Sequence, residues 1–211
     1  MTLVVLRRIA AALLCLLAAP VAAHAAWPER PVRVVITWAP GGTTDFVARL
    51  YAQRLGEVLH QPFVVENRTG GSGAVGWNQV VQSRPDGYTL LITDNSITTV
   101  PPLLPDLGFD MRAAMEPVAE LVDYPAVFTV PAALPVHNLA ELVAMARARP
   151  DDLNYGSMGN GSTMHLYMEV FQDLAGLRMT HVPYRGAGPA FLDTVAGRIQ
   201  LVIAGPPTMI S

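Results

Sequence analysis

Four glycine-rich segments hold most of the residues whose chemistry suits ligand binding. They are Ala39–Asp45, Asn67–Gly73, Gly156–Thr163 and Pro183–Gly188, each lying between a β-type run and a run with helical spacing. The first turn of a helix has unpaired N–H groups and a partial positive charge, so it attracts anions. Glycine lets a ligand approach the backbone, and Ser or Thr hydroxyls add donors. We interpret the four segments together as an anion site, although any single one is equally well explained as a tight turn.

The absence of lysine narrows the kind of anion. The 14 Lys-or-Arg positions are all Arg, which excludes a Walker A phosphate loop, a Schiff-base lysine and a kinase-type lysine. Gly71–Gly76 matches the dinucleotide pattern G-x-G-x-x-G, but we find no clear acidic partner at the end of a following strand. A carboxylate held mainly by neutral donors fits better, and no cofactor is expected.

A search for catalytic groups finds little. Ser72 lacks the second glycine of a G-x-S-x-G nucleophile motif, and the sequence has no H-E-x-x-H motif. His165 and Glu169 are four residues apart on a predicted helix, a spacing that favours a surface ion pair over a metal site. His60 and His181 have no thiol or paired carboxylate near them in the sequence. We expect no catalytic residue and no metal site.

Several other residues leave two interpretations open. Asp45, in the first turn of a predicted helix, acts either as a capping acid or in the pocket. Arg185 either pairs with a ligand carboxylate or faces solvent. Trp27, Trp38 and Trp77 are expected to be packing residues, with Trp38 at a strand end beside the first segment.

The composition excludes some classes of protein. Of the 211 residues, 51% are apolar and 15% are charged, which excludes a disordered or polyelectrolyte chain. The net charge of −3 gives no electrostatic reason to expect a nucleic-acid partner.

Residues 1–25 have the pattern of a secretory signal peptide. Arg7 and Arg8 precede an apolar stretch, and Ala23-His24-Ala25 predicts cleavage before Ala26. The apolar stretch is shorter than the roughly 20 residues that span a bilayer, which disfavours a retained anchor. Cys15 lies inside this stretch and follows Leu rather than a small residue, so we reject a lipid anchor.

The elements that must position the four segments alternate between strand and helix patterns. In the first half, strands are expected at Arg33–Trp38, Pro62–Glu66 and Tyr88–Thr93, with helices at Val47–Leu59 and Ala74–Gln82. Such alternation predicts parallel strands with right-handed crossovers.

The second half repeats the theme after a proline-rich middle, Ile97–Pro135, which looks like a crossing between two lobes. Two strands are expected there, at Pro117–Val122 and Ala126–Val130. Beyond it we expect a helix capped by Asn138 and ending near Arg149, strand Leu153–Gly156, helix Thr163–Ala175, strand Met179–Val182, a helix ending near Ala196, and strand Ile199–Ala204.

Six ordered motifs resemble a known family. They are Trp27-Pro-Glu-Arg-Pro-Val-Arg33, Pro40-Gly-Gly-Thr-Thr-Asp45, Val65-Glu-Asn-Arg68, Pro85-Asp-Gly-Tyr-Thr-Leu90, Tyr155 to Gly161 with His165-Leu166, and His181-Val-Pro-Tyr-Arg-Gly186. Together they are similar to the substrate-binding component of tripartite tricarboxylate transporters, the Bug or TctC-like family. The resemblance implies an α/β, two-lobed type II periplasmic binding protein that binds a small carboxylate and delivers it to integral-membrane transporter components. It also implies a periplasmic monomer.

The resemblance places the ligand in the four segments. The residues that match the family's ligand loops are Pro40, Gly41, Gly42, Thr43, Thr44, Asp45, Gly70, Gly71, Ser72, Gly73, Ser157, Gly159, Gly161, Ser162, Thr163, Tyr184, Arg185 and Gly186. The second segment departs from the family, because Thr69 replaces a proline and Ser72 replaces a glycine.

The resemblance also bears on the division of the chain. Family members continue well past the strand that ends at Ala204, whereas this sequence stops at Ser211. We therefore expect a signal peptide at 1–25, lobe 1 at 26–123 and part of lobe 2 at 124–211, with the second lobe and the return to the first incomplete. Such a chain is expected to be marginally stable; the alternative is a compact short form.

Two further functions compete with solute binding for transport. The chain is alternatively a receptor subunit that presents its ligand to a membrane sensor, or an exported hydrolase acting on a carboxylated substrate. The lack of a nucleophile–base pair in the sequence disfavours the hydrolase.

Overall fold

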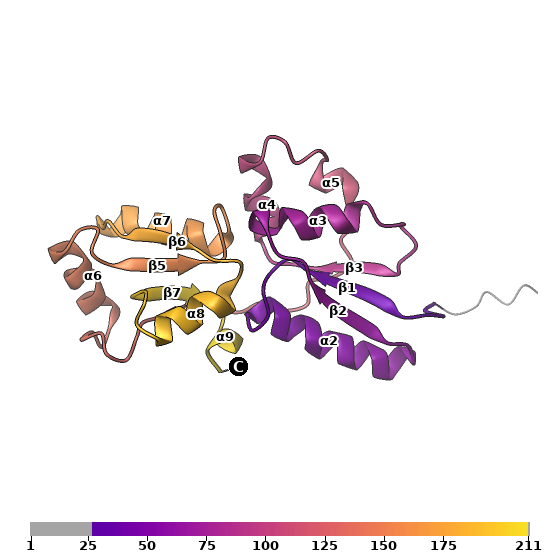
Figure 1. Cartoon of the computed structure of the whole chain (residues 1–211), viewed down its shortest axis with the longest axis horizontal. Helices are drawn as coiled ribbons and strands as arrows, with labels where there is room; N and C mark the ends of the chain where they lie inside the picture. Colours follow the sequence, from indigo (N-terminus) through magenta and orange to yellow (C-terminus); the bar gives the residue numbers. More distant parts are fainter. Residues whose placement is uncertain (1–26, 211) are drawn as a thin grey trace, which may run out of the picture.

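The computed structural model describes residues 27–210, so the expected signal peptide, with Cys15 and the cleavage site, lies outside the described residues. Figure 1 shows two α/β bodies, each built on its own sheet, and we call them lobe 1 and lobe 2. None of the helices between residues 27 and 210 has the length and apolar character needed to cross a membrane.

Lobe 1 is built on three parallel strands in the order β2-β1-β3. Its elements are β1 (Val32–Ile36), α2 (Thr43–Leu59), β2 (Phe63–Asn67), the 3-10 turn η1 (Gly71–Gly73), α3 (Ala74–Val81) and β3 (Thr89–Ile92). The apolar run of β1 is almost wholly buried, as expected for the central strand of a parallel sheet covered on both faces.

The middle of the chain differs from the expectation. It contains α4 (Ser96–Thr99), the 3-10 turn η2 (Pro101–Leu103) and α5 (Met111–Ala114). The strand expected at Pro117–Val122 is wrong: the segment has no regular structure. Its apolar residues do not face a core, since Val118 is 88% exposed, and Pro117 has no N–H to donate to a neighbouring strand.

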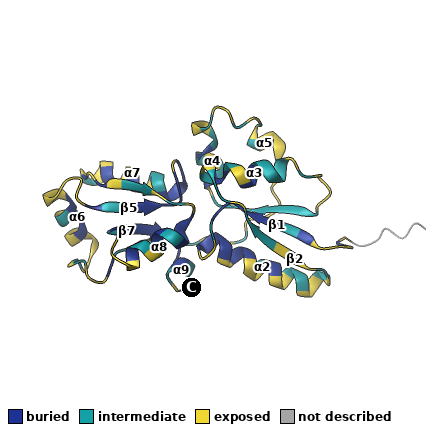
Figure 2. Cartoon of the chain, viewed as in Figure 1, coloured by how far each residue is buried: buried dark blue, intermediate teal, exposed yellow. Residues whose placement is uncertain are grey.

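Lobe 2 is built on four strands in the order β4-β7-β5-β6, with only β4 antiparallel to its neighbour. Its elements are β4 (Val127–Thr129), α6 (Leu139–Ala148), β5 (Asn154–Ser157), α7 (Thr163–Ala175), β6 (Thr180–Pro183), α8 (Ala187–Val195), β7 (Leu201–Ala204) and α9 (Pro206–Ile210). Figure 2 shows its buried residues gathered along β5 and β7.

The two sheets share a connection pattern, since β6-β5-β7 in lobe 2 repeats the order β2-β1-β3 in lobe 1. The first of the three parallel strands along the chain, β1 in lobe 1 and β5 in lobe 2, lies between the other two, and glycine-rich segments follow the first two of these strands. All four segments therefore follow the carboxyl ends of parallel strands. The two sheets point these ends toward each other, which brings the segments to the junction of the lobes (Figure 1).

Candidate functional site

The loops after β1 and β6 meet directly across the junction of the lobes. The N–H of Ala39 donates to the carbonyl oxygen of Arg185 at 2.9 Å. Glycine makes this approach possible: a Cβ on Gly188 would lie 2.5 Å from the Pro40 carbonyl oxygen, and one on Gly186 2.8 Å from the Ala39 nitrogen. Any larger residue at these two positions would force the loops apart.

Two helix N-termini converge at this contact. Helices α2 and α8 have Gly42 and Gly186 as N-cap residues, which offer no side chain to cap the first amides. A Cβ on Gly42 would lie 3.7 Å from the backbone nitrogens of Ala187 and Gly188. The positive ends of two helices from opposite lobes therefore face the same point. The N–H of Thr43 is already bonded, to the hydroxyl of Thr208 on α9 at 2.9 Å.

A small cavity lies at this point. Its volume is about 10 Å³, which is room for one water molecule. It is lined by Trp38, Gly42, Thr43, Thr44, Tyr124, Met158, Met164, Ala187, Ala204 and Gly205. Trp38 is only 2% exposed, and its indole N–H is buried without a hydrogen-bond partner. The cavity thus combines two helix N-termini with a buried indole that interacts with Asp94.

A larger cleft of about 270 Å³ adjoins the cavity and shares Trp38 and Met158 with it. The cleft is lined by Trp38, Gly70, Gly71, Ser72, Met158, Gly159, Asn160, Pro183, Tyr184 and Arg185. The exposed guanidinium of Arg185 forms no ion pair with any residue in 27–210. The hydroxyl of Tyr184 donates to Asp193 at 2.8 Å, and burial together with this bond raises the pKa of Tyr184 to about 12.

The second segment brings Ser72 to the wall of this cleft. Ser72 has φ 51° and ψ 35°, the left-handed region that favours glycine. The position where the related family has glycine therefore keeps a glycine-like backbone. Its hydroxyl reaches toward lobe 2, since a Cβ on Gly159 would lie 2.8 Å from Ser72 Oγ. Gly73 instead packs on the ring of Trp77, inside lobe 1.

The third segment uses its amides within the protein. The N–H of Gly159 donates to Ser157 Oγ at 3.0 Å, and that of Gly161 to His165 Nδ1 at 3.1 Å. The N–H of Thr163 donates to Ser96 Oγ at 3.1 Å. Ser162 caps α7, and Thr99 donates its hydroxyl to the Gly161 carbonyl at 2.8 Å. Of the predicted site residues of this segment, Gly159 lines the cleft. Gly161 and Thr163 bond to Thr99 and Ser96, whereas Ser157 and Ser162 bond within lobe 2.

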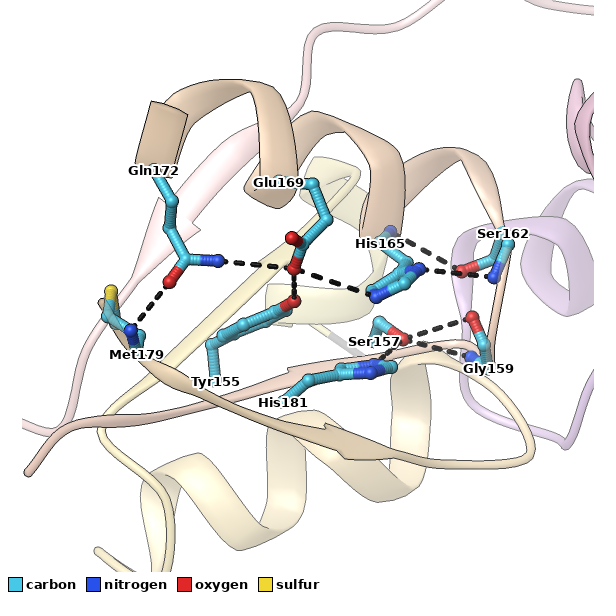
Figure 3. A network of polar contacts seen from close by, with 10 residues as sticks. Tyr155, Ser157, Gly159, Ser162, His165, Glu169, Gln172, Met179 and His181 are labelled. Atoms are coloured by element: carbon cyan, nitrogen blue, oxygen red, sulfur yellow. Dashed lines mark hydrogen bonds and ion pairs between the residues drawn. The ribbon is translucent and has the colours of Figure 1, made fainter. Parts of the chain in front are cut away.

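Behind this segment lies a polar network between α7 and strands β5 and β6 (Figure 3). Ser157 Oγ lies 2.6 Å from His181 Nε2, and the imidazole of His181 stacks on that of His165 at 4.0 Å between centroids. Burial and then the nearby His165 lower the pKa of His181 to about 4. His165 also lies 3.7 Å from Glu169, which accepts a hydrogen bond from the hydroxyl of Tyr155.

The sequence analysis missed this network. His181 lies within β6, and its partner is the hydroxyl of Ser157, a pairing that the search for thiols and paired carboxylates did not cover. The contact arises because β5 and β6 are neighbours, which places Tyr155 opposite His181 in the register. Because β5 and β6 are far apart in the sequence, no short stretch of sequence indicates that these two strands pair. Across residues 27–210, no three His, Cys, Asp or Glu side chains are grouped to hold a metal ion.

Asp45 finds its hydrogen-bond partners within lobe 1. Its carboxylate accepts hydrogen bonds from Arg49, from the Asn67 amide at 2.9 Å and from the N–H of Gly41 at 3.2 Å. Burial alone would raise the pKa of Asp45, but these hydrogen bonds lower it below its usual value. Asp45 therefore holds the first segment in place inside lobe 1.

Asp94 is a further residue that sequence reasoning missed. It follows β3, and its Oδ2 is buried without a hydrogen-bond partner. Asp94 directly follows the strand predicted at Tyr88–Thr93. Because β3 runs parallel to β1, the two strands end at the same edge of the sheet, so this position in the sequence could have indicated a residue near the site.

Comparison with known proteins was consistent with this geometry. Residues 47–211 match the model of the "Tripartite tricarboxylate transporter family receptor". The chain is 37% identical over 198 residues to a UPF0065 protein of Bordetella pertussis, covering 93% of the chain and 60% of that relative. It is 34% identical to Protein BugT of the same organism, again over 60% of the relative. The chain thus spans about 60% of the length of these relatives.

Solved structures of related proteins have the same fold. Periplasmic binding protein BugD superposes with a TM-score of 0.82 at 31% identity, covering 86% of this chain and 60% of that one. R. palustris Rpa4515 with adipate gives 0.81 at 38%, covering 86% and 61%. MatC from Rhodopseudomonas palustris with bound malate gives 0.75 at 29%, covering 85% and 61%. The expected two-lobed α/β fold of periplasmic binding proteins is confirmed.

Proposed function

Since the chain belongs to the tripartite tricarboxylate transporter receptor family, we propose that it is a solute-binding protein that captures a small carboxylate. One observation carries the proposal. The N-termini of α2 and α8, which follow the N-cap residues Gly42 and Gly186 in opposite lobes, converge at a cavity that is also lined by the buried Trp38. Convergent N–H donors and helix dipoles favour a carboxylate, and closing the lobes on it completes the donor set.

The rest of the solute occupies the adjoining cleft of about 270 Å³. Arg185 lines this cleft without an ion-pair partner among residues 27–210 and supplies a positive charge to the anion. The related proteins solved with adipate and with malate support a small carboxylate as the solute class.

The protein binds its solute without converting it. The one serine–histidine pair of the network, Ser157 and His181, is the arrangement nearest to a nucleophile and base in residues 27–210. Ser157 is only 1% exposed, and its hydroxyl is held by the N–H of Gly159 and by His181. A substrate in the cleft does not reach that hydroxyl, which supports a receptor and not a hydrolase.

Delivery follows from the family. We propose that residues 1–25 direct export to the periplasm, and that residues 26–123 and 124–211 act as the two lobes, the second in part. The loaded monomer then passes its solute to integral-membrane transporter components. Mass spectrometry of the exported protein checks the first step, with Ala26 as the expected N-terminus; an intact Met1 would contradict it.

A thermal-shift screen against small mono-, di- and tricarboxylates tests the binding proposal. A ligand at about 100 times its Kd stabilises the folded state by about 2.7 kcal/mol, so a micromolar binder is readily detected. Methyl esters of the same acids are the matched controls, since they keep the carbon skeleton and lose the charge. The proposal fails if no acid raises the melting temperature, or if the esters raise it equally.

A further inference from the structure

The third glycine-rich segment touches the other side of the lobe junction at Gly161. The carbonyl oxygen of Gly161 accepts a hydrogen bond from the hydroxyl of Thr99 at 2.8 Å, and a Cβ at Gly161 would collide with the side chain of Leu103. Thr99 ends α4 and Leu103 ends η2, which follow β3 and lie on the lobe 1 side in Figure 1. We call the contact of Gly161 with these two residues the latch. It lies two residues from Gly159, which lines the cleft.

His165 supports the latch from within lobe 2. The buried N–H of Gly161 donates to His165 Nδ1 at 3.1 Å. A ring nitrogen that accepts a hydrogen bond carries no proton, so the imidazole is neutral and its proton is on Nε2. His165 lies in the first turn of α7, and its Nε2 is 3.7 Å from Glu169 Oε1 (Figure 3).

Ionisable side chains face this imidazole from three elements. Glu169 belongs to α7, His181 on β6 stacks on the ring at 4.0 Å between centroids, and Tyr155 on β5 stacks at 6.4 Å. Burial raises the pKa of Tyr155, and burial and then His165 lower the pKa of His181 to about 4, so both side chains are neutral between pH 8 and 5. The residues of α4 and η2 are not ionisable. Histidine ordinarily titrates within this pH range, so the group gains its proton at His165.

A second proton on the imidazole of His165 must go to Nδ1, because Nε2 already carries one. Nδ1 then becomes a donor and no longer accepts from the N–H of Gly161. A buried N–H without an acceptor is unfavourable, so the segment has to move until water reaches it. The charged ring keeps a partner of opposite charge in Glu169, which favours the protonated state.

We propose that His165 is a pH-sensitive lock on the junction of the lobes. The neutral imidazole holds Gly161 against Thr99 and Leu103, and the protonated imidazole releases Gly161 and lets the lobes open. Opening lowers the affinity for solute in an acidic medium. That consequence rests on the proposed function above, whereas the lock itself does not.

Nuclear magnetic resonance of the nitrogen-15-labelled chain, without solute, follows the lock between pH 8 and 5. At pH 8 we expect His165 with its proton on Nε2 and a Gly161 amide that exchanges slowly with water. As His165 gains its second proton, the protection of the Gly161 amide, corrected for the intrinsic pH dependence of exchange, should fall at least about tenfold. A proton on Nδ1 at pH 8, or unchanged protection after His165 has titrated, would overturn the proposal.

Small-angle scattering over the same pH range tests the opening of the lobes. The unchanged protein should become more extended as the pH falls, with the midpoint at which His165 titrates. His165→Asn places an amide oxygen where Nδ1 accepts and does not titrate, so this variant should stay closed. His60→Asn is the matched control, because His60 is exposed and has φ 55°, a conformation that asparagine also adopts.

Opening that is equal in the unchanged protein and in His165→Asn, or no opening in either, overturns the proposal. If His165→Asn fails to fold, the resonance titration of the unchanged protein decides. If the lobes open as expected but the thermal-shift screen finds no carboxylate, the lock stands and the proposed function fails. If a carboxylate binds and the lobes do not open with pH, the proposed function stands and the lock is wrong.

Discussion

The N–H of Ala39 in lobe 1 donates to the carbonyl oxygen of Arg185 in lobe 2 at 2.9 Å, and this bond lies beside the starts of α2 and α8. The backbone of one lobe thus touches the backbone of the other where the solute is proposed to bind. If the solute binds there, closing the lobes also brings together the N–H donors at the starts of α2 and α8.

Gly188→Ala should prevent the lobes from closing without preventing the chain from folding. The added Cβ would lie 2.5 Å from the Pro40 carbonyl oxygen in the other lobe, so the loops cannot reach their present contact. Small-angle scattering should show a more open particle, and solute affinity should fall by at least about tenfold. Circular dichroism should stay unchanged. Wild-type scattering and affinity would contradict this view of the junction.

Arg185→Gln should weaken solute binding by about tenfold without changing the melting temperature. Arg185 is exposed and forms no ion pair within residues 27–210, so folding does not depend on it. Titrations at low and high salt should also show a smaller salt dependence in the variant. Arg84→Gln, at another exposed arginine, is the control; equal losses in both variants would remove Arg185 from the site.

Ser72→Gly should keep stability within about 1 kcal/mol, because relief of the left-handed backbone offsets the added freedom of glycine. Ser72 has φ 51°, and its hydroxyl lies near Gly159 across the cleft. Removing it should widen the cleft and improve the binding of bulkier acids relative to small ones. An unchanged ranking of acids by calorimetry would mean that Ser72 does not shape selectivity.

Local signals predicted the elements well where caps and periodicity agreed. Helix α7 has the predicted bounds, Thr163–Ala175, since Ser162 caps its start and Gly176 ends it in the left-handed conformation. The strand expected at Pro117–Val122 failed because its apolar residues had no sheet edge to join. Propensity alone does not supply a pairing partner.

The site was predictable only in part, for a similar reason. The glycine segments were visible in the sequence because each follows a strand. The contact between Ser157 and His181 depends on strand order, and the interaction of Trp38 with Asp94 depends on β1 and β3 being neighbours. Strand order is a long-range property that no short window of sequence reports.

Acidification should destabilise the fold through His181. Its pKa in the folded state, about 4, is below the ordinary 6.5, so the folded protein resists protonation while the unfolded chain accepts it. The stabilisation is complete above pH 6.5 and is lost progressively as the pH falls toward 4. The shift in the pKa of His181 sets an upper bound of about 3 kcal/mol on this loss of folding stability.

Urea unfolding at several pH values between 7.5 and 4 measures this loss. His181→Gln keeps a polar partner for Ser157 and does not titrate, so its stability should fall less over the same range. Carboxylates contribute equally to both proteins and cancel in the comparison. Parallel pH profiles for the two proteins would exclude His181 as the cause.

A carboxylate that binds where α2 and α8 begin should be excluded by Gly42→Ala. Gly42 has φ −90°, which alanine adopts readily, and the new Cβ would lie 3.7 Å from the nitrogens of Ala187 and Gly188. The variant should therefore fold, with a loss of less than about 1 kcal/mol at the N-cap, while its methyl group occupies the place of the carboxylate. Gly56→Ala, in the interior of the same helix, is the control. Calorimetric titration with the tightest acid from the screen should give no measurable binding to Gly42→Ala and wild-type affinity for Gly56→Ala. Wild-type affinity in a folded Gly42→Ala variant would show that the carboxylate does not bind at the starts of α2 and α8.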